Sequence, residues 1–139
     1  MPDKKTTDLT VAGTLDLTEL VAIVQGGTSV KATLSSILTQ AINTQTVSYT
    51  LVLSDRNNIV EMNVASANNL TVPPNSLVAF PIGSRVDIAQ YGAGQTTVVA
   101  GSGVTIRATP GLKLAAQYAG ATLYKRATDE WVLLGNLST

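Results

Sequence analysis

The chain contains neither cysteine nor histidine. Without cysteine it can form no disulfide and offers no thiolate nucleophile. Without histidine it lacks the usual general base, the commonest zinc ligand and the central member of a Ser-His-Asp triad. Aromatic residues make up only 4% of the 139 residues. We therefore expect the protein not to be an enzyme, and we expect no metal site and no bound cofactor.

Neither sign of charge is in excess. Nine Lys and Arg residues balance nine Asp and Glu residues, so no long-range field attracts nucleic acid or an anionic membrane surface. Every uninterrupted apolar run is far shorter than the ~20 residues of a membrane helix, and the polar opening, MPDKKTTDLT, does not resemble a secretory signal. We expect neither nucleic acid nor a membrane as a partner. A chain that is 45% hydrophobic and 13% charged favours self-association as a homodimer or homotrimer.

Paired carboxylates are the remaining candidates for catalysis or cation binding. Asp16 lies three residues before Glu19, and Asp129 is adjacent to Glu130. Adjacent carboxylates on a strand point to opposite faces, and neither pair has the spacing of a calcium loop. Solvated turn charges are the better interpretation of both pairs.

The order of patterns along the chain predicts three parts. Residues 1–14 are polar and are expected to form a flexible N-terminal arm. Residues 15–45 contain two short β-type runs on either side of Gly26 and Gly27, which predicts a hairpin, followed by a helical spacing of apolar residues over 34–42. This hairpin and short helix would form a contact segment. Residues 46–139 would form the main β-domain.

The β-domain is predicted from alternating apolar residues and frequent turn signals. About eight to ten short strands, with turns every 8 to 12 residues, are typical of a β-sandwich or jelly roll. Two glycine pairs, Gly92 with Gly94 and Gly101 with Gly103, are each followed by β-branched residues and not by a helix. A phosphate-binding loop requires a helix at that point. We expect these glycines to provide positive φ angles in hairpin turns.

Candidate contact residues come from the arm and from the scarce aromatics. Trp131 fits either the core or a subunit interface, and Lys125 with Arg126 is the only positive pair in the β-domain, too small for a nucleic-acid footprint. The residues predicted to take part in an interface are Lys4, Lys5, Asp8, Leu9, Tyr118, Tyr124 and Trp131.

Three long segments, 18–37, 49–106 and 118–137, contain the words TVPPN, PIGS, GAGQ, GVTI and DEWVLLG. Together they resemble the small β-rich modules of tailed-bacteriophage virion proteins, which occur in capsid decoration (cement) proteins and in tail fibres. The resemblance implies a passive structural part of the virion. It carries no catalytic motif.

Two roles compete within this resemblance. A tail-fibre or baseplate module for attachment would be joined to a longer shaft, whereas this chain begins with Met and ends shortly after LLGN. The resemblance therefore favours a decoration protein that bridges and stabilises the major capsid protein shell. Such a protein would be made in the bacterial cytoplasm and would lie on the outer surface of the capsid. The arm would become ordered against the shell.

Overall fold

The computed structural model describes residues 20–139, and for residues 22–25 and 36–37 it describes the backbone only. The chain divides into two units, residues 1–39 and 40–139. The boundary falls before the one predicted at residue 46, because the strand formed by residues 42–45 pairs within the second unit.

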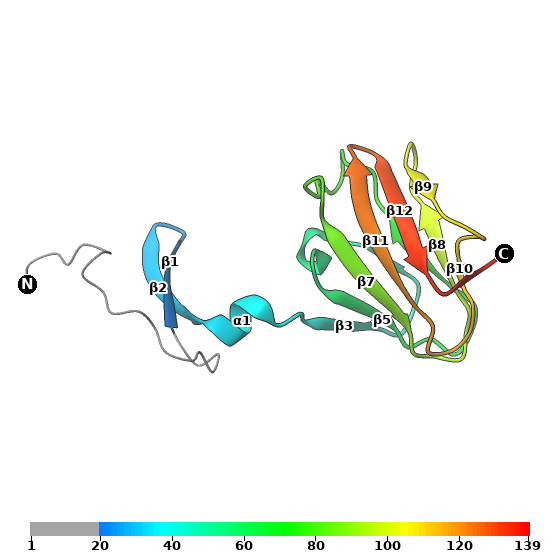
Figure 1. Ribbon diagram of the computed structural model, residues 1–139, viewed down its shortest axis with the longest axis horizontal. Coiled ribbons are helices and arrows are strands. Elements are labelled where there is room, and N and C mark those ends of the chain that lie inside the picture. Colours follow the sequence, from blue (N-terminus) through cyan, green and yellow to red (C-terminus); the bar gives the residue numbers. More distant parts are fainter. Residues whose placement is uncertain (1–19) are drawn as a thin grey trace, which may run out of the picture. The chain divides into compact units, whose positions relative to one another are not determined.

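The described part of the first unit is a hairpin followed by one turn of helix (Figure 1). Strand β1 (Leu20–Gln25) pairs antiparallel with β2 (Thr28–Thr33). Gly26 and Gly27, with φ of 57° and 79°, form the two-residue loop, and two positive φ angles are what a turn matching the twist of a hairpin requires. The predicted hairpin is confirmed.

The helix is shorter than predicted. Helix α1 (Leu34–Leu38) has five residues, and its last backbone bond runs from the Thr39 N–H to the Ser35 carbonyl. Ile42, which the helical spacing had placed on the same face, begins a strand and pairs with Ile59. A helix this short gains little from propagation, and a β-branched residue such as Ile42 favours the extended backbone of a strand.

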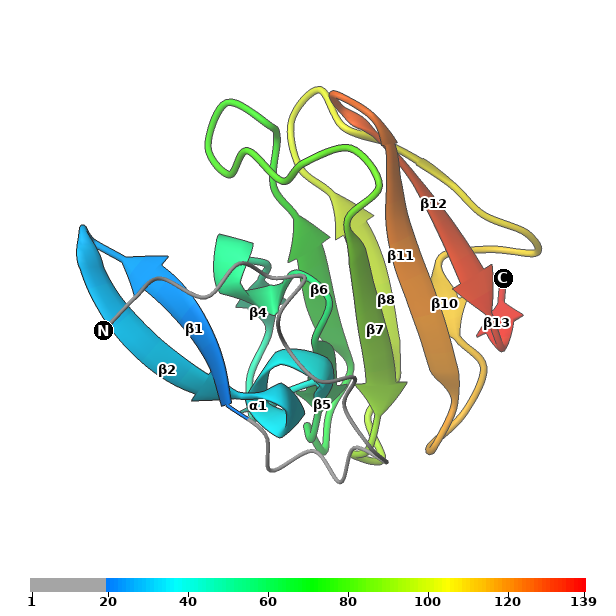
Figure 2. The same cartoon turned by 60° about the vertical axis from the view of Figure 1, so that its left-hand side comes forward.

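The second unit is a sandwich of two sheets (Figures 1 and 2). The larger sheet has six strands, in the spatial order β3 (Ile42–Gln45), β5 (Ile59–Met62), β7 (Arg85–Gln90), β11 (Gly120–Ala127), β12 (Glu130–Gly135) and β9 (Thr105–Arg107). The smaller sheet has five, in the order β13 (Leu137–Ser138), β10 (Lys113–Leu114), β8 (Thr96–Ala100), β6 (Asn68–Val72) and β4 (Tyr49–Thr50). The predicted all-β sandwich is confirmed.

The chain builds the first half of this sandwich by passing back and forth between the sheets. Strands β3, β5 and β7 lie parallel to one another in one sheet, and β4, β6 and β8 lie parallel in the other. The result is a stack of three coils, each made of two successive strands, one in each sheet. The first coil is β3 with β4, the second is β5 with β6, and the third is β7 with β8. A jelly roll is made of antiparallel Greek keys, so of the two predicted architectures the sandwich is the one observed. Strands β10 to β13 then add antiparallel pairs to the third coil.

The space between the sheets is filled by alternate residues of each strand. In β6, for example, Leu70 and Val72 are fully buried while Asn69 is exposed, which is the period of two that a half-buried strand requires. The buried hydrophobic core consists of Leu51, Val60, Met62, Val64, Leu70, Val72, Phe80, Val86, Ile88, Val98, Leu114, Ala119, Ala121, Leu123, Trp131, Leu133 and Leu137.

The first coil closes the core with polar side chains. Asn43 is in register with the buried Val60 of the second coil. Its Nδ2 donates to the Tyr49 hydroxyl at 3.1 Å and to Asp55 Oδ1 at 2.8 Å, and its Oδ1 accepts a bond from Gln45. The Asp55 side chain also accepts bonds from the Tyr49 hydroxyl and the Val52 N–H. A polar layer that satisfies its own hydrogen bonds can end a stack of coils where an apolar layer would be left open to water.

The glycine pairs of the β-domain do not act as predicted. Gly92 and Gly94 lie between β7 and β8, which belong to different sheets, so the segment crosses from one sheet to the other and is not a hairpin turn. Of the four glycines only Gly103, with φ of 78°, has a positive φ. At Gly94 a Cβ would lie 1.9 Å from the carbonyl oxygen of Ser66. The glycine is needed there because two backbone segments approach too closely for any side chain.

Candidate functional site

The predicted contact residues of the arm, Lys4, Lys5, Asp8 and Leu9, lie outside the described residues. The remaining three, Tyr118, Tyr124 and Trp131, belong to the sandwich and occupy different environments.

Trp131 is a core residue. Its side chain is 1% exposed and packs edge-to-face against Phe80, with ring centroids 5.3 Å apart and planes at 84°. An aromatic pair in this geometry adds to the stability already gained by burial. The prediction that Trp131 takes part in an interface is wrong, because its ring faces the space between the sheets. The alternative of a core position is the one observed.

Lys125 is also buried, at 2% exposure, and lies next to that ring. Its ammonium group donates to Asn75 Oδ1 at 2.5 Å and to the Phe80 carbonyl at 2.8 Å, and it sits 5.8 Å from the Trp131 ring centroid. Burial lowers the pKa of this ammonium group, and the nearby Asp129 carboxylate opposes the shift. Lys125 therefore anchors the loop after β6 and adds nothing to the surface. The predicted positive pair with Arg126 is split between two faces of β11.

Tyr118, in contrast, is 72% exposed and stacks edge-to-face on Tyr91, which is 50% exposed, with centroids 5.7 Å apart. Tyr118 also has φ of 66°, a left-handed conformation that costs a non-glycine residue roughly 1–2 kcal/mol. The Tyr118 N–H donates to the Gln90 carbonyl at 2.7 Å, which holds the backbone in place. The pair forms an exposed aromatic surface.

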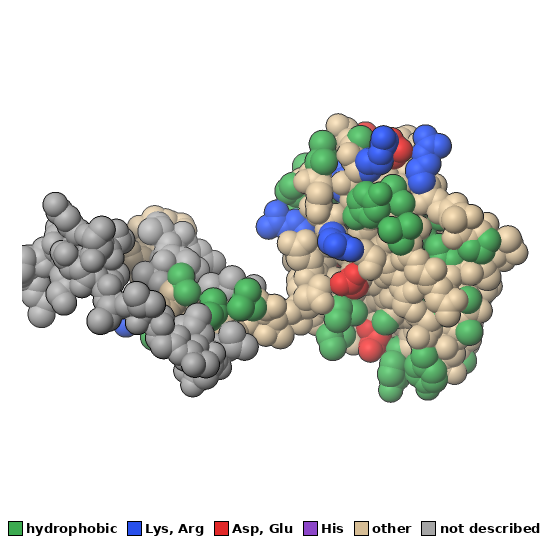
Figure 3. Space-filling model, viewed as in Figure 1, with side chains coloured by type: hydrophobic (Ala, Val, Ile, Leu, Met, Phe, Trp, Pro, Cys, Tyr) green, Lys and Arg blue, Asp and Glu red, His purple; other side chains and the backbone are tan. Residues whose placement is uncertain are grey.

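Tyr124 lies on the outer face of the six-stranded sheet, in a row of directly paired residues. It is opposite Arg85 of β7 on one side and Val132 of β12 on the other, and Val132 is opposite Arg107 of β9. In Figure 3, Lys and Arg side chains lie above and to the lower left of a hydrophobic patch over β11 and β12. This face carries a shallow concave surface that is open to solvent.

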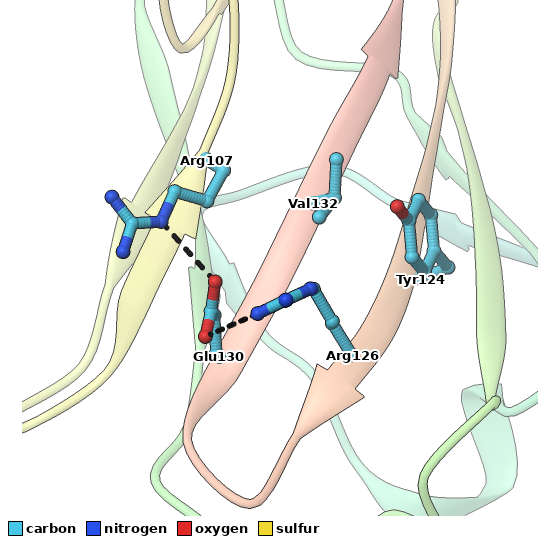
Figure 4. A pocket seen from close by; sticks show the side chains of 5 residues that line it. All are labelled: Arg107, Tyr124, Arg126, Glu130 and Val132. Carbon is cyan, nitrogen blue, oxygen red and sulfur yellow. Dashed lines mark hydrogen bonds and ion pairs between the residues drawn. The ribbon is translucent and has the colours of Figure 1, made fainter.

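The concave surface, here named the arginine hollow, has a volume of about 380 Å³ (Figure 4). Glu130 lies at its side and receives two arginines: Arg107 Nε is 3.2 Å from Oε1, and Arg126 Nη1 is 3.0 Å from Oε2. The register of β11 on β12 shifts between Lys125 and Ala127, and such a bulge re-aims the residue inside it, here Arg126. The hollow is lined by Arg107, Tyr124, Arg126, Glu130 and Val132.

The carboxylate pair at residues 129 and 130 is divided by its contacts. Asp129 Oδ1 accepts the Asn75 N–H at 2.7 Å, whereas Glu130 binds the two arginines. Neither is a solvated turn charge as predicted, because each has a structural partner. The described residues contain no group of three or more His, Cys, Asp or Glu side chains arranged to hold a metal ion. None of the helices among them is both long enough and apolar enough to span a membrane.

Arg107 is not among the residues that the sequence singles out, and no local pattern pairs it with Arg126. They are 19 positions apart, and they meet only because β9 lies parallel to β12 at the edge of the sheet. Parallel pairing of strands joined by a long connection leaves no local signal. The one available hint was that Arg107 alternates with apolar Ile106 and Ala108.

Comparisons with protein-family models, with curated proteins and with solved structures find no match for this chain.

Proposed function

We propose that this protein is a structural component of a tailed-bacteriophage particle, a decoration protein that binds the outer surface of the capsid and bridges subunits of the major capsid protein. It acts by contact and not by catalysis. A bound protein adds its binding free energy to the stability of the shell, and many weak copies on one closed shell act together.

The observation that carries this proposal is the contrast between the two units. The sandwich has its own core of 17 hydrophobic residues, to which no described residue of the first unit contributes. Large apolar side chains are exposed on both units, among them Leu20 and Leu38 on the first unit and Leu77 on the sandwich. A two-stranded hairpin is marginally stable in water without a surface to pack on. A rigid sandwich joined to a small unit with exposed apolar side chains suits a protein that attaches itself to a larger assembly.

Counting copies in purified particles tests the proposal. Quantitative mass spectrometry with isotope-labelled peptides is expected to give a copy number per particle that is comparable to the number of contacts between capsid subunits in one shell. Labelled antibody in electron micrographs is expected on the capsid. A handful of copies, with label on the tail only, would reject the capsid role.

A second candidate is an attachment module of a tail fibre or baseplate. The arginine hollow favours it, because a concave surface with two guanidinium groups and a tyrosine is suited to ligand binding. Label confined to the tail, together with loss of adsorption to host cells when antibody against the sandwich is added, would support this candidate over the first.

Self-association as a dimer or trimer is part of the proposal. The exposed pair of Tyr91 and Tyr118 supports it, since tyrosines offer large contact area at low entropic cost. Sedimentation equilibrium of the full chain is expected to show an oligomer that Tyr118→Ser converts to monomer. Arg56→Ser, at another exposed residue, is the matched control and is expected to leave the oligomer intact. A monomeric wild-type chain would reject this part.

A further inference from the structure

The arginine hollow combines charge and apolar surface in one small volume. Its volume of about 380 Å³ lies within the range of small-molecule sites, roughly 300–1,000 Å³. Its side chains come from three neighbouring strands, β9, β12 and β11, and backbone pairing holds these strands in place. Sites on strands are held more rigidly than sites on loops.

The electrostatics of the hollow favour an anion. Glu130 is the single carboxylate between Arg107 and Arg126, so the three side chains together carry one positive charge. Glu130 is 22% exposed, while the two arginine side chains are 68% and 61% exposed. Each guanidinium group uses one nitrogen on Glu130, and within residues 20–139 its remaining N–H groups bond to no protein acceptor. The carboxylate orients both groups and leaves their other donors for a ligand.

The rest of the hollow is apolar. Tyr124 and Val132 line it beside the arginines, as Figure 4 shows. A second hollow of about 260 Å³ shares Arg107 and Val132 and continues to Leu134, which is 55% exposed. The C–H groups of a pyranose ring pack well on a tyrosine ring and on aliphatic side chains through dispersion. The apolar surface beside the arginines therefore extends from Tyr124 to Leu134.

From these contacts we propose that the arginine hollow binds an acidic saccharide, with uronic-acid carboxylates on the free N–H groups of Arg107 and of Arg126, which lie on opposite sides of Glu130 (Figure 4), and a sugar ring on Tyr124. A planar guanidinium group matches a carboxylate through two parallel hydrogen bonds. Nucleic acid fits less well, because residues 40–139 hold six basic and five acidic residues and one of the six, Lys125, is buried. A duplex requires many phosphate contacts.

The test is a titration of the full purified chain, without phage particles, so that its result does not depend on where the protein sits in a virion. The probe is trigalacturonic acid, and the neutral probe of equal length is maltotriose. Binding is followed by calorimetry and by NMR shifts of backbone amides and arginine Nε–H groups. We expect trigalacturonic acid to bind, with shifts at Arg107, Tyr124 and Arg126, and maltotriose to bind at least about tenfold more weakly.

Variants locate the site. Arg107→Gln and Arg126→Gln are each expected to weaken binding about tenfold, because each removes charge-assisted hydrogen bonds. Tyr124→Ala is expected to weaken it several-fold without changing its salt dependence. Lys113→Gln removes one charge from the other sheet and is the matched control, expected to bind within about twofold of wild type. Circular dichroism melting curves confirm that each variant is folded.

Three results would overturn the proposal. The first is no binding of trigalacturonic acid to the wild type. The second is equal loss in Lys113→Gln and Arg107→Gln, which would mean general charge attraction. The third is equal affinity for maltotriose. Copy number in the particle bears on the capsid role and not on this site, so the failure of one proposal is distinguishable from the failure of the other.

Discussion

Buried polar side chains of the sandwich meet their hydrogen-bonding requirements in different ways. Asp55, at 2% exposure, accepts bonds from Asn43, Tyr49 and the backbone of Val52. Lys125 donates to two oxygens of one loop. The hydroxyl of Ser84 is buried, and within residues 20–139 it has no partner. A buried polar group costs free energy unless it is hydrogen-bonded. Removing a bonded group therefore destabilises the protein, whereas removing the unbonded hydroxyl of Ser84 is expected to stabilise it.

Ser84→Ala is expected to stabilise the protein by about 1 kcal/mol, because it removes an unbonded buried hydroxyl. The backbone bonds of this residue, from its N–H to the Pro81 carbonyl and from the Lys125 N–H to its carbonyl, are retained by alanine. Chemical denaturation measures the change. Ser102→Ala, at an exposed position, is the control and should change stability little. A loss of stability in Ser84→Ala would show that the hydroxyl has a partner such as bound water.

Alkaline pH provides a second residue-level prediction. Burial raises the pKa of the Tyr49 phenol; the hydrogen bond from Asn43 opposes this shift and the Asp55 carboxylate adds to it. A group whose folded pKa is raised contributes stability below its unfolded pKa and loses it as pH rises through the folded pKa. The contribution of Tyr49 to the free energy of unfolding of the wild type is thus expected to fall from about pH 10 upward.

Tyr49→Phe isolates this effect. Near pH 8 the variant should be about 1 kcal/mol less stable than wild type, because the hydrogen bond to Asp55 is lost. The difference should shrink above pH 10. Lys125 has the opposite effect, because its lowered pKa makes the free energy of unfolding rise with pH. Since Lys125 is present in both proteins, its effect cancels in the difference between wild type and Tyr49→Phe. Denaturation curves at pH 8 to 11 measure the difference, and a constant difference would contradict the assignment.

At the scale of elements, the fold depends on the segments that carry the chain from one sheet to the other, here called crossings. Strands β7 and β8 are sequential in the chain yet belong to different sheets, and the segment between them lies against the backbone of residues 64 and 66. The Gly94 N–H donates to the Val64 carbonyl at 2.9 Å, and the Asn68 side chain donates to the Gly94 carbonyl at 3.3 Å. Close stacking of successive crossings keeps the three coils in register.

Gly94→Ala is expected to destabilise the sandwich by about 3 kcal/mol or more, because its Cβ would lie 1.9 Å from a backbone atom of Ser66 and overpacked backbone cannot relax cheaply. Thermal unfolding measures the loss. The neighbouring exposed residue provides a control, Ala93→Ser, which should melt close to wild type. An unchanged melting temperature in Gly94→Ala would mean that the crossings are not tightly stacked.

At the scale of the whole molecule, the division at residue 40 predicts which fragment folds. The core residues of the sandwich all fall between Leu51 and Leu137, so the fragment 40–139 contains its own core. We expect this fragment to melt cooperatively within a few degrees of the full chain.

A fragment that starts at residue 46 is the matched comparison. It lacks β3 and therefore Asn43, whose amide is bonded to both Tyr49 and Asp55. Loss of a buried polar partner costs roughly 1–3 kcal/mol, to which the lost strand pairing adds, so this fragment should be clearly less stable than 40–139. Equal melting of the two fragments would place the boundary at residue 46 after all. Calorimetry of both fragments decides.

The arginine hollow belongs to this largest scale as well. Arg107 and Arg126 meet on Glu130 across the edge of the six-stranded sheet, and no local pattern in the chain predicts that contact. Tyr124 could be singled out because aromatics are scarce, and it does lie in the hollow. The same reasoning chose Trp131, which is buried. Scarcity marks a residue but does not say which face of a strand it occupies.

The sequence by itself determined the period-two alternation, the β-class and the hairpin closed by Gly26 and Gly27, because these follow from local sterics and from which residues must leave water, while it left a sandwich and a jelly roll as alternatives. Only the tertiary structure decided that strands pair in parallel between coils, that Ile42 joins a sheet and not a helix, and that Lys125 lies inside. Those outcomes depend on long-range pairing, where free energy comes from contacts between residues far apart in the chain.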